Sequence, residues 1–321
     1  MRGPESQDGR LIPAESAVLD RALDWLTANL AWFRPGRWDQ FFPVRAFPGT
    51  TALELLLVCR ALLRGPRAAR VTQFVQSALD IAEDVVDHPD FTAGLHRLDD
   101  QFPYHAWLVV LMERLGRPAG QLRSTVRALV ESHRRELGRA SMSPQKSIEL
   151  NYILGLADID CGQTDPDGPE VRQALPLQGD PSLLDDDEVY TVTHMLFYVT
   201  DFAARPVLPG GEEGRQRLRT VVRTLLDTYL TEGHWDLCAE LLLCAQALGD
   251  GDDELANKGW RHLAAAQRED GSVPGPPFRP SVLAERCGAK AAAYVFRTCY
   301  HPTLVTALAA AERERLHDVQ G

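Results

Sequence analysis

The sequence predicts an all-α protein, an (α/α)6 toroid in which six helix hairpins form an inner and an outer ring of helices. Amphipathic segments alternate along the chain with segments that are apolar on nearly every side. The apolar segments recur at the spacing of a helix hairpin, and strand-like alternation between paired turn signals is missing. These three observations favour a ring of hairpins over a mixed fold.

The amphipathic segments carry apolar residues at helical spacing on one face and charged residues on the other. In 17–32, the stripe consists of Leu19, Leu23, Leu26 and Leu30. Such a pattern is typical of a helix on the outside of a protein. The other segments of this kind are 69–86, 120–136, 213–231 and 253–268.

The segments of the second kind are apolar nearly all round, so we expect them to be surrounded by protein. Residues near their starts are Thr51, Tyr104, Ser147, Tyr190, Trp235 and Tyr300. Their separations of 53, 43, 43, 45 and 65 residues are close to the length of one hairpin with its turns. Six such pairs would close a ring, and an open helical solenoid is the structural alternative.

We expect a single domain at 15–313, between a flexible N-terminus at 1–14 and a C-terminal tail at 314–321. The fourth outer helix has to lie within 160–186, where Gly, Pro and Asp allow only a short helix near 170–174. The connection 270–298 carries four prolines. Long loops in compact domains are often lids or binding loops, so this connection is a candidate lid.

Composition and missing motifs exclude several classes of function. The formal net charge is -11 and no basic cluster occurs, which argues against a nucleic-acid partner. No apolar run reaches the roughly 18 residues of a membrane span, and the N-terminus lacks a secretory apolar core. The six cysteines form no CxxC pair, which is typical of reduced thiols in the cytoplasm. Without a GxGxxG, P-loop or GxSxG motif, we expect no nucleotide cofactor and no serine hydrolysis.

In a ring of hairpins all inner helices run in the same direction, so their N-terminal ends meet at one mouth. Unusual polar residues gather at these starts. We expect the catalytic residues to be His194, Tyr190, Asp187, His301 and Asp236. The expected substrate contacts are Arg45, Tyr104, His105, Trp107, Glu149, Tyr152, Tyr198 and Trp235. For each histidine, hydrogen-bonded packing is the alternative.

The densest polar segment is 185–201, where Asp187, Tyr190, His194, Tyr198 and Asp201 follow steps of three and four residues. Such a line on a buried helix must pair internally or face a wet cavity. Asp187, Tyr190 and His194 together suit general acid–base chemistry near neutral pH. Alternatively, the acids at the start form a solvated helix N-terminus, and Asp201 pairs with the residue four positions later.

The predicted ring resembles the toroid of terpenoid cyclases and protein prenyltransferase β-type subunits. Gln267-Arg-Glu-Asp-Gly-Ser is similar to a helix-end motif of their repeats. Prenyltransferases hold a catalytic zinc with an Asp-x-Cys at one inner-helix start and a His at the last. The resemblance implies Asp236, Cys238 and His301 as zinc ligands, with an open fourth position. If His194 and His234 also bind the metal, the ligand set would suit an iron or copper ion as well.

Asp185-Asp-Asp-Glu188 also resembles the Asp-x-Asp-Asp acid of class II terpene cyclases, which implies Asp187 as proton donor. Here Glu occupies the last position, and only 7% of residues are aromatic, which puts a carbocation cage in doubt. Sugar-acting (α/α)6 enzymes also place histidines and acids at such a mouth. That resemblance implies Glu149 and Asp236 as paired carboxylates.

The whole chain resembles an actinobacterial protein family that shares the segments around Thr193-His and Trp235-Asp-Leu. This resemblance implies no activity, but it suggests specialised metabolism. We expect a small-molecule enzyme with acid–base or metal-assisted lyase, cyclase or isomerase chemistry; the metal would be zinc, iron or copper. The alternatives are a non-catalytic helical scaffold, a ligand-binding protein, or a zinc-dependent transferase or sugar-acting enzyme.

Overall fold

Helices make up the regular structure of the computed structural model, and none of the residues that it describes lies in a β-strand. The described residues are 13–43, 45–65, 68–133, 143–159, 168, 171, 175, 179–205 and 211–320. The prediction of an all-α fold is confirmed.

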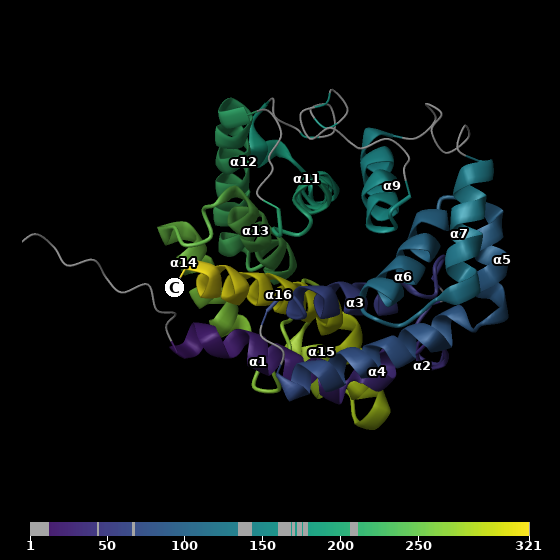
Figure 1. Ribbon diagram of the computed structural model, residues 1–321. Coiled ribbons are helices and arrows are strands. Elements are labelled where there is room, and N and C mark those ends of the chain that lie inside the picture. Colours follow the sequence, from purple (N-terminus) through teal and green to yellow (C-terminus); the bar gives the residue numbers. More distant parts are fainter. Residues whose placement is uncertain are drawn as a thin grey trace, which may run out of the picture.

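Six helices form an inner ring around a common centre (Figure 1). They are α3 (Thr50–Leu62), α6 (Phe102–Arg114), α9 (Pro144–Leu156), α11 (Asp186–Thr200), α13 (Trp235–Leu248) and α16 (Gly288–Gln320). Each packs against the next in this order, and α16 packs against both α13 and α3. The ring is therefore closed, which confirms the toroid and excludes the open solenoid.

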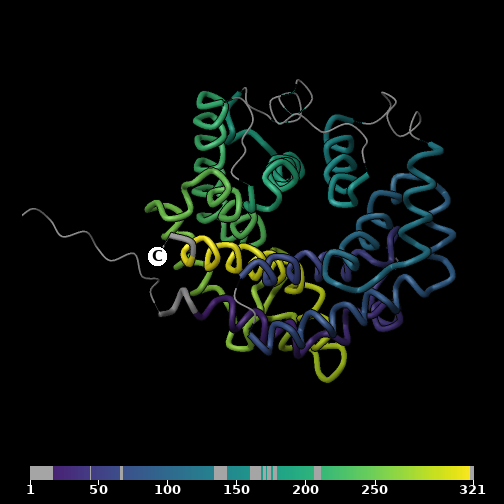
Figure 2. The backbone as a smooth tube through the Cα atoms, viewed as in Figure 1, coloured from purple at the N-terminus to yellow at the C-terminus, as the bar shows by residue number. Residues whose placement is uncertain are grey.

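The amphipathic helices lie outside this ring, as their patterns predict (Figures 1 and 2). They are α1 (Pro13–Ala28), α4 (Ala69–Val86), α7 (Gly120–Ser132), α12 (Gly211–Glu232) and α14 (Glu254–Ala266). Each turns its apolar face inward; α4 packs on α3, and α12 packs on α13. Of the short helix expected near 170–174, the structure describes residue 171 alone, and the N-terminal residues 1–12 lie outside the described residues.

Shorter elements lie between outer and inner helices along the chain. They are the α-helices α2 (Pro35–Asp39), α5 (Pro89–Arg97) and α15 (Pro280–Ala284), and the 3-10 helices Leu30–Phe33 and Pro181–Leu183. In the described part of the chain, no helix is both long and apolar enough to cross a bilayer.

The last inner helix is longer than its sequence indicates. It begins at Gly288 rather than near Tyr300, and Pro302 lies inside it. A proline has no N–H to donate to the carbonyl four residues earlier. Here that carbonyl, of Thr298, accepts a hydrogen bond from the Gly275 N–H at 2.9 Å. The preceding loop thereby makes the internal proline tolerable, and the helix also includes residues 314–320, which we expected to form a tail.

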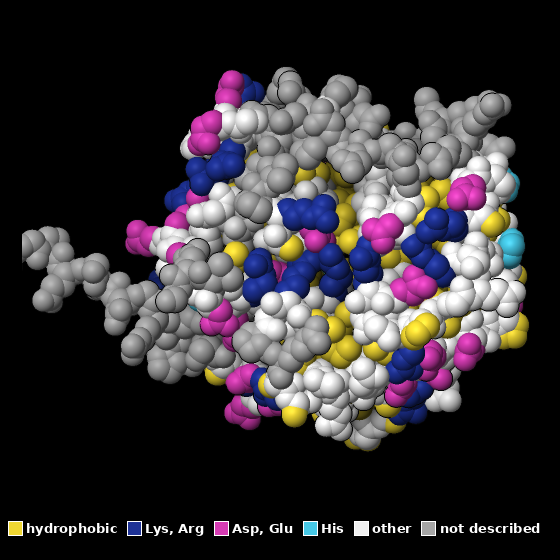
Figure 3. All heavy atoms as spheres, viewed as in Figure 1, with side chains coloured by type: hydrophobic (Ala, Val, Ile, Leu, Met, Phe, Trp, Pro, Cys, Tyr) yellow, Lys and Arg dark blue, Asp and Glu magenta, His cyan; other side chains and the backbone are white. Residues whose placement is uncertain are grey.

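The C-terminal ends of the inner helices are tied together by ion pairs. Asp201, at the end of α11, accepts hydrogen bonds from Arg60 Nη1 at 2.6 Å and Nη2 at 2.9 Å. Arg64, which follows the C-terminus of α3, lies 3.1 Å from Asp201 and 2.5 Å from Glu312 of α16. Figure 3 shows Lys and Arg side chains, with acidic ones among them, across the middle of the face viewed in Figure 1. These pairs join α3, α11 and α16 and favour a closed ring.

Candidate functional site

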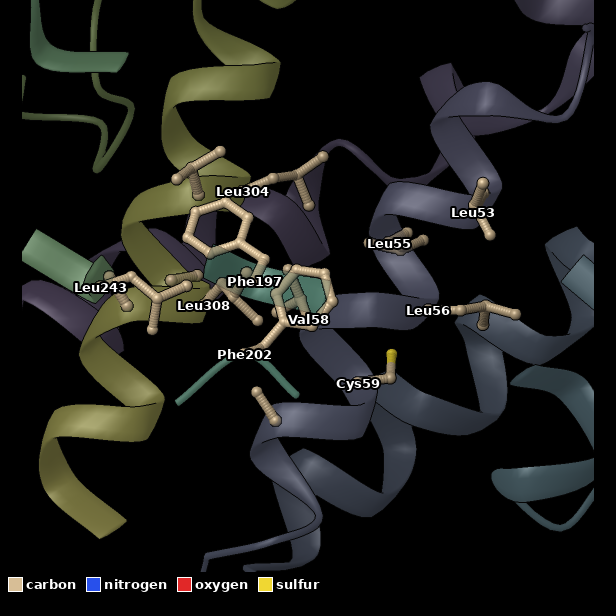
Figure 4. Close-up of a cluster of buried hydrophobic side chains, with 14 of the residues drawn as sticks. Leu53, Leu55, Leu56, Val58, Cys59, Phe197, Phe202, Leu243, Leu304 and Leu308 are labelled. Atoms are coloured by element: carbon tan, nitrogen blue, oxygen red, sulfur yellow. The ribbon is translucent and has the colours of Figure 1, made fainter. Parts of the chain in front are cut away.

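A cavity of about 370 Å³ lies within the inner ring, and residues from all six inner helices line it. Its volume lies within the range of roughly 300–1,000 Å³ that is typical of small-molecule sites. One part is apolar, with Val58, Phe197, Phe202, Leu304 and Leu308 close together (Figure 4). Polar side chains of α3, α6, α9, α11, α13 and α16 line the rest: Glu54, Tyr104, Glu149, His194, Tyr198, Glu240 and His301. Among the described residues, no Lys or Arg lines this cavity.

Glu240 is the buried centre of the polar part, with 1% of its surface exposed. Its Oε2 accepts a hydrogen bond from the Thr193 hydroxyl. Its Oε1 lies 3.6 Å from His194 Nε2 and 3.8 Å from His301 Nε2. Two imidazoles therefore share one carboxylate oxygen. Burial alone would raise the pKa of Glu240, but the two histidines hold it well below its usual range.

His301 has a carboxylate on each side of its ring. Its Nδ1 lies 3.5 Å from Glu54 Oε2, and its Nε2 lies 3.5 Å from Asp236 Oδ1. Tyr190 OH donates to the other oxygen of Asp236 at 2.8 Å. Burial lowers the pKa of His301, but Asp236, Glu54 and Glu240 outweigh burial and raise it well above its usual value. For Asp236, burial has the larger effect: it raises the pKa of this carboxyl more than the charge of His301 lowers it.

Both imidazoles remain open to the cavity. The side chain of His194 keeps 45% of its surface exposed and that of His301 keeps 31%, whereas that of Glu240 keeps 1%. Burial lowers the pKa of His194, but Glu240 raises it by more. The cavity thus faces two hydrogen-bond donors backed by acids, and these can donate a proton to a bound polar group.

A second polar group lies on the wall formed by α9 and α11. Tyr198 OH donates to Glu149 Oε1 at 2.7 Å. Burial raises the pKa of Glu149, and Tyr198 only partly offsets this. Tyr104 and Trp107 complete this wall. Four of the expected substrate contacts, these two with Glu149 and Tyr198, therefore lie together at the cavity.

Asp187 is not at the cavity. It is exposed in the first turn of α11, where Asp185 and Glu188 form a capping box. Acids at a helix N-terminus stabilise the exposed N–H groups and the helix dipole. The solvated-terminus interpretation is therefore correct for this segment, and the structure does not support Asp187 as the proton donor.

Two of the expected histidines have structural roles. His105 is 2% exposed and packs against the rings of Phe47 and Phe91, whose centroids lie 4.6 and 4.9 Å away. His234 caps α13 by accepting from the Leu237 N–H. Neither lines the cavity, so the packing alternative is correct for both.

Three further residues expected at the substrate lie elsewhere. Arg45 stacks over Trp38 at 3.8 Å and donates to the Tyr300 hydroxyl at 2.5 Å. Tyr152 donates to Asp201 at 2.8 Å, within the ion pairs at the other end of the ring. Trp235 is half-buried and packs against the core. None of the three lines the cavity.

The candidate metal ligands differ from those that the sequence suggests. One ligand atom each from Asp236, Glu240 and His301 can be chosen so that all lie within 4.8 Å of one another. Cys238 and His234 do not belong to this group. On α13, Glu240 lies one turn after Asp236 on the same face, whereas Cys238 points elsewhere. Burial also raises the pKa of the Cys238 thiol, which disfavours the thiolate that a metal needs.

Sequence reasoning missed Glu54 and Glu240. Each is the single acid in an apolar run, Glu54 within 51–59 and Glu240 within 237–248. A carboxylate on a helix surrounded by protein needs a partner, and this signal was present in the sequence. The candidate lid 270–298, in contrast, contributes no residue to the cavity wall.

Residues 19–311 match the protein family described as "Domain of unknown function (DUF6895)". The chain belongs to this family. No curated protein matches the sequence. A similar solved structure is that of the type II terpene cyclase MstE from Scytonema, a variant in complex with geranylgeranyl dihydroxybenzoate. The alignment covers 94% of this chain and 99% of that chain, with 14% sequence identity and a TM-score of 0.47.

Proposed function

We propose that the chain is an enzyme that acts on an apolar small molecule carrying one polar group, with lyase, cyclase or isomerase chemistry in the central cavity. The observation that carries this proposal is the division of one cavity into an apolar part and a part with two histidines backed by buried acids. An apolar body would fill the first part, and its polar group would meet the imidazoles.

His194 and His301 would donate to this polar group, with Glu240 and Asp236 holding the imidazoles in place. Tyr190 orients Asp236 through its hydroxyl. The pair of Tyr198 and Glu149 offers a second place at which a proton can be exchanged. Lyase, cyclase and isomerase reactions need such a donor and acceptor around one substrate.

The cavity wall also indicates the class of substrate. Trp107, Phe197 and Tyr198 line the cavity, and the face of an aromatic ring favours positive charge that develops on a bound molecule. Because no described Lys or Arg lines the cavity, a phosphorylated substrate would lack its usual partners. A sugar would lose hydrogen bonds against the apolar part. We therefore expect a neutral, largely apolar substrate with a hydrogen-bond acceptor.

The proposal can be tested by incubating the protein with an apolar metabolite extract of the source organism, followed by mass spectrometry. His194→Asn removes an imidazole and Leu308→Trp fills the apolar part, while Cys238→Ala serves as the control. We expect a metabolite that wild type and the control consume and that both cavity variants leave intact. An isomer of equal mass indicates a cyclase or isomerase, and two fragments indicate a lyase.

Two results would contradict the proposal. Turnover by His194→Asn at the wild-type rate would place the chemistry elsewhere. A metabolite that stays bound but unchanged would instead indicate the ligand-binding alternative.

A further inference from the structure

We propose that Asp236, Glu240 and His301 bind one divalent transition-metal ion through Oδ1, Oε1 and Nε2. These three groups come from α13 and α16 and lie close together. Glu240 and His301 line the polar part of the cavity, and Asp236 lies beside His301. The inference deepens the proposed function and rests on it for the role of the ion. With His301 Nε2 on the metal, the ion rather than His301 would polarise the polar group of the substrate as a Lewis acid, and His194 would remain the proton donor. Binding of the ion is tested separately from turnover.

The distances suit a shared ion better than direct hydrogen bonds. His301 Nε2 lies 3.5 Å from Asp236 Oδ1 and 3.8 Å from Glu240 Oε1. Hydrogen bonds between N–H and O are about 2.7–3.2 Å long, so both contacts are too long. With metal–ligand bonds of roughly 2.1 Å, two ligands of a tetrahedral ion are about 3.4 Å apart. The observed separations are close to this spacing.

The second oxygen of each acid already has a hydrogen-bond donor, and the second nitrogen of the imidazole faces a carboxylate. Tyr190 OH donates to Asp236 Oδ2, and Thr193 Oγ1 donates to Glu240 Oε2. His301 Nδ1 faces Glu54 Oε2 at 3.5 Å. Metal-binding histidines usually present their second ring nitrogen to a carboxylate, which fixes the tautomer. These partners leave Oδ1, Oε1 and Nε2 directed toward one another.

A buried oxygen at the site has no hydrogen-bond donor. Asp236 is 7% exposed, and within the described part of the structure its Oδ1 accepts no hydrogen bond. An uncompensated buried carboxylate oxygen is costly. In addition, Asp236 and Glu240 place two acids one helical turn apart in the interior. A divalent ion would supply the missing partner and balance both charges.

The ligand atoms indicate the class of ion. One imidazole and two carboxylates, without a thiolate, suit Zn²⁺, Fe²⁺ or Mn²⁺ rather than a soft ion such as Cu(I). An imidazole nitrogen also makes the site less suitable for Ca²⁺, which takes oxygen ligands. Zn²⁺ is therefore the probe, and Ca²⁺ is the negative control.

The experiment is calorimetric titration of the full chain with Zn²⁺ after treatment with a chelator. We expect one strong site in wild type and at least a 100-fold loss of affinity in His301→Ala and Glu240→Gln. Glu54→Gln, which changes only the partner behind His301, should weaken binding roughly 10- to 100-fold. Cys238→Ala and His234→Ala are matched controls and should bind as wild type does. Circular dichroism checks folding, and Glu240→Gln keeps the side-chain volume if His301→Ala does not fold.

Unchanged Zn²⁺ affinity in the folded His301→Ala or Glu240→Gln variant would overturn the inference, as would the absence of stoichiometric binding in wild type. The two proposals fail separately. Undiminished turnover by chelator-treated protein refutes the metal role and leaves the proposed function intact. Site-specific Zn²⁺ binding without any turnover supports the metal site and refutes the proposed enzyme.

Discussion

Replacing Asp201 by Asn tests how the inner ring is closed. The Asp201 carboxylate joins Arg60 of α3, and Arg64 just after α3, to the end of α11. It also accepts a hydrogen bond from Tyr152 of α9. Its side chain is only 7% exposed, and those of both arginines are 17% exposed. Asn keeps the size and tolerates the left-handed backbone at this position, where φ is 52°. The variant therefore removes the charge and little else.

The expected loss follows from burial. Removing one partner of a buried ion pair costs about 3–5 kcal/mol because the remaining charge is uncompensated. Arg64 keeps Glu312 as a partner, so we expect the lower end of this range, about 3 kcal/mol. For a chain of this size that corresponds to a fall of roughly 4–5 °C in Tm.

The loss should depend on pH in a defined direction. Burial raises the pKa of Asp201, but the hydrogen bonds and charge of Arg60, with Arg64, lower it below its usual value. An acid with a depressed pKa in the folded state stabilises the fold above its unfolded pKa of about 3.9, and this stabilisation is lost as pH falls through the folded pKa. The difference between wild type and Asp201→Asn should be constant from pH 7 to pH 5 and shrink below pH 4.

The assay is urea unfolding followed by circular dichroism at pH 7, 5 and 3.5. Asp158→Asn is a matched control, because Asp158 also has a left-handed backbone, with φ of 53°, and pairs with Arg114 at 2.9 Å. That pair is exposed, 76% at Asp158 and 43% at Arg114, so its removal should cost less than about 1 kcal/mol. Equal losses in the two variants, or a difference that persists undiminished in acid, would refute this explanation of ring closure.

Three further predictions concern the cavity, the loop before α16 and a packing histidine. Leu308→Trp should abolish ligand binding in the cavity and leave the circular dichroism spectrum unchanged. If a calorimetric titration with the consumed metabolite shows undiminished binding, the ligand lies elsewhere. Gly271→Ala should lower the free energy of unfolding by more than about 1 kcal/mol, because φ is 91° and a Cβ atom would meet the carbonyl oxygen of Arg21. Gly36 has open space around it, so Gly36→Ala should be nearly neutral. Thermal unfolding compares the two variants. Burial lowers the pKa of His105, so the wild-type protein should lose stability relative to His105→Leu as pH falls from 7 to 5. A difference in unfolding free energy that stays constant over this range would contradict this prediction.

Hydrophobic patterning predicts most of the fold, because the inner and outer helices differ in the number of faces that they bury. Segment 69–86 matches α4, and the six predicted inner starts all fall within inner helices. The predicted start of α16 is wrong because a proline such as Pro302 is typical of a helix boundary. Its tolerance depends on the hydrogen bond between Gly275 and Thr298, a tertiary contact that local sequence does not reveal.

Part of the site can also be predicted from the sequence, because the ring of helices determines which segments come together. Closing the ring brings Tyr104, Glu149 and His194 together at the cavity, as expected. They do not all lie at the helix starts, because Tyr104 is in the first turn of α6, Glu149 in the second turn of α9 and His194 in the third turn of α11. Which side chains point inward depends on the rotation of each helix about its axis. That rotation turns His105 toward Phe91 and brings Glu240 to the site while Cys238 stays outside it.

Soaking crystals of the His194→Asn variant with the consumed metabolite would locate the bound substrate. We expect electron density between Trp107 and Leu308, with the polar atom of the ligand directed toward His301. Density confined to the surface hollow beside Arg219 or the one beside Tyr294, with nothing bound inside the ring, would contradict this expectation.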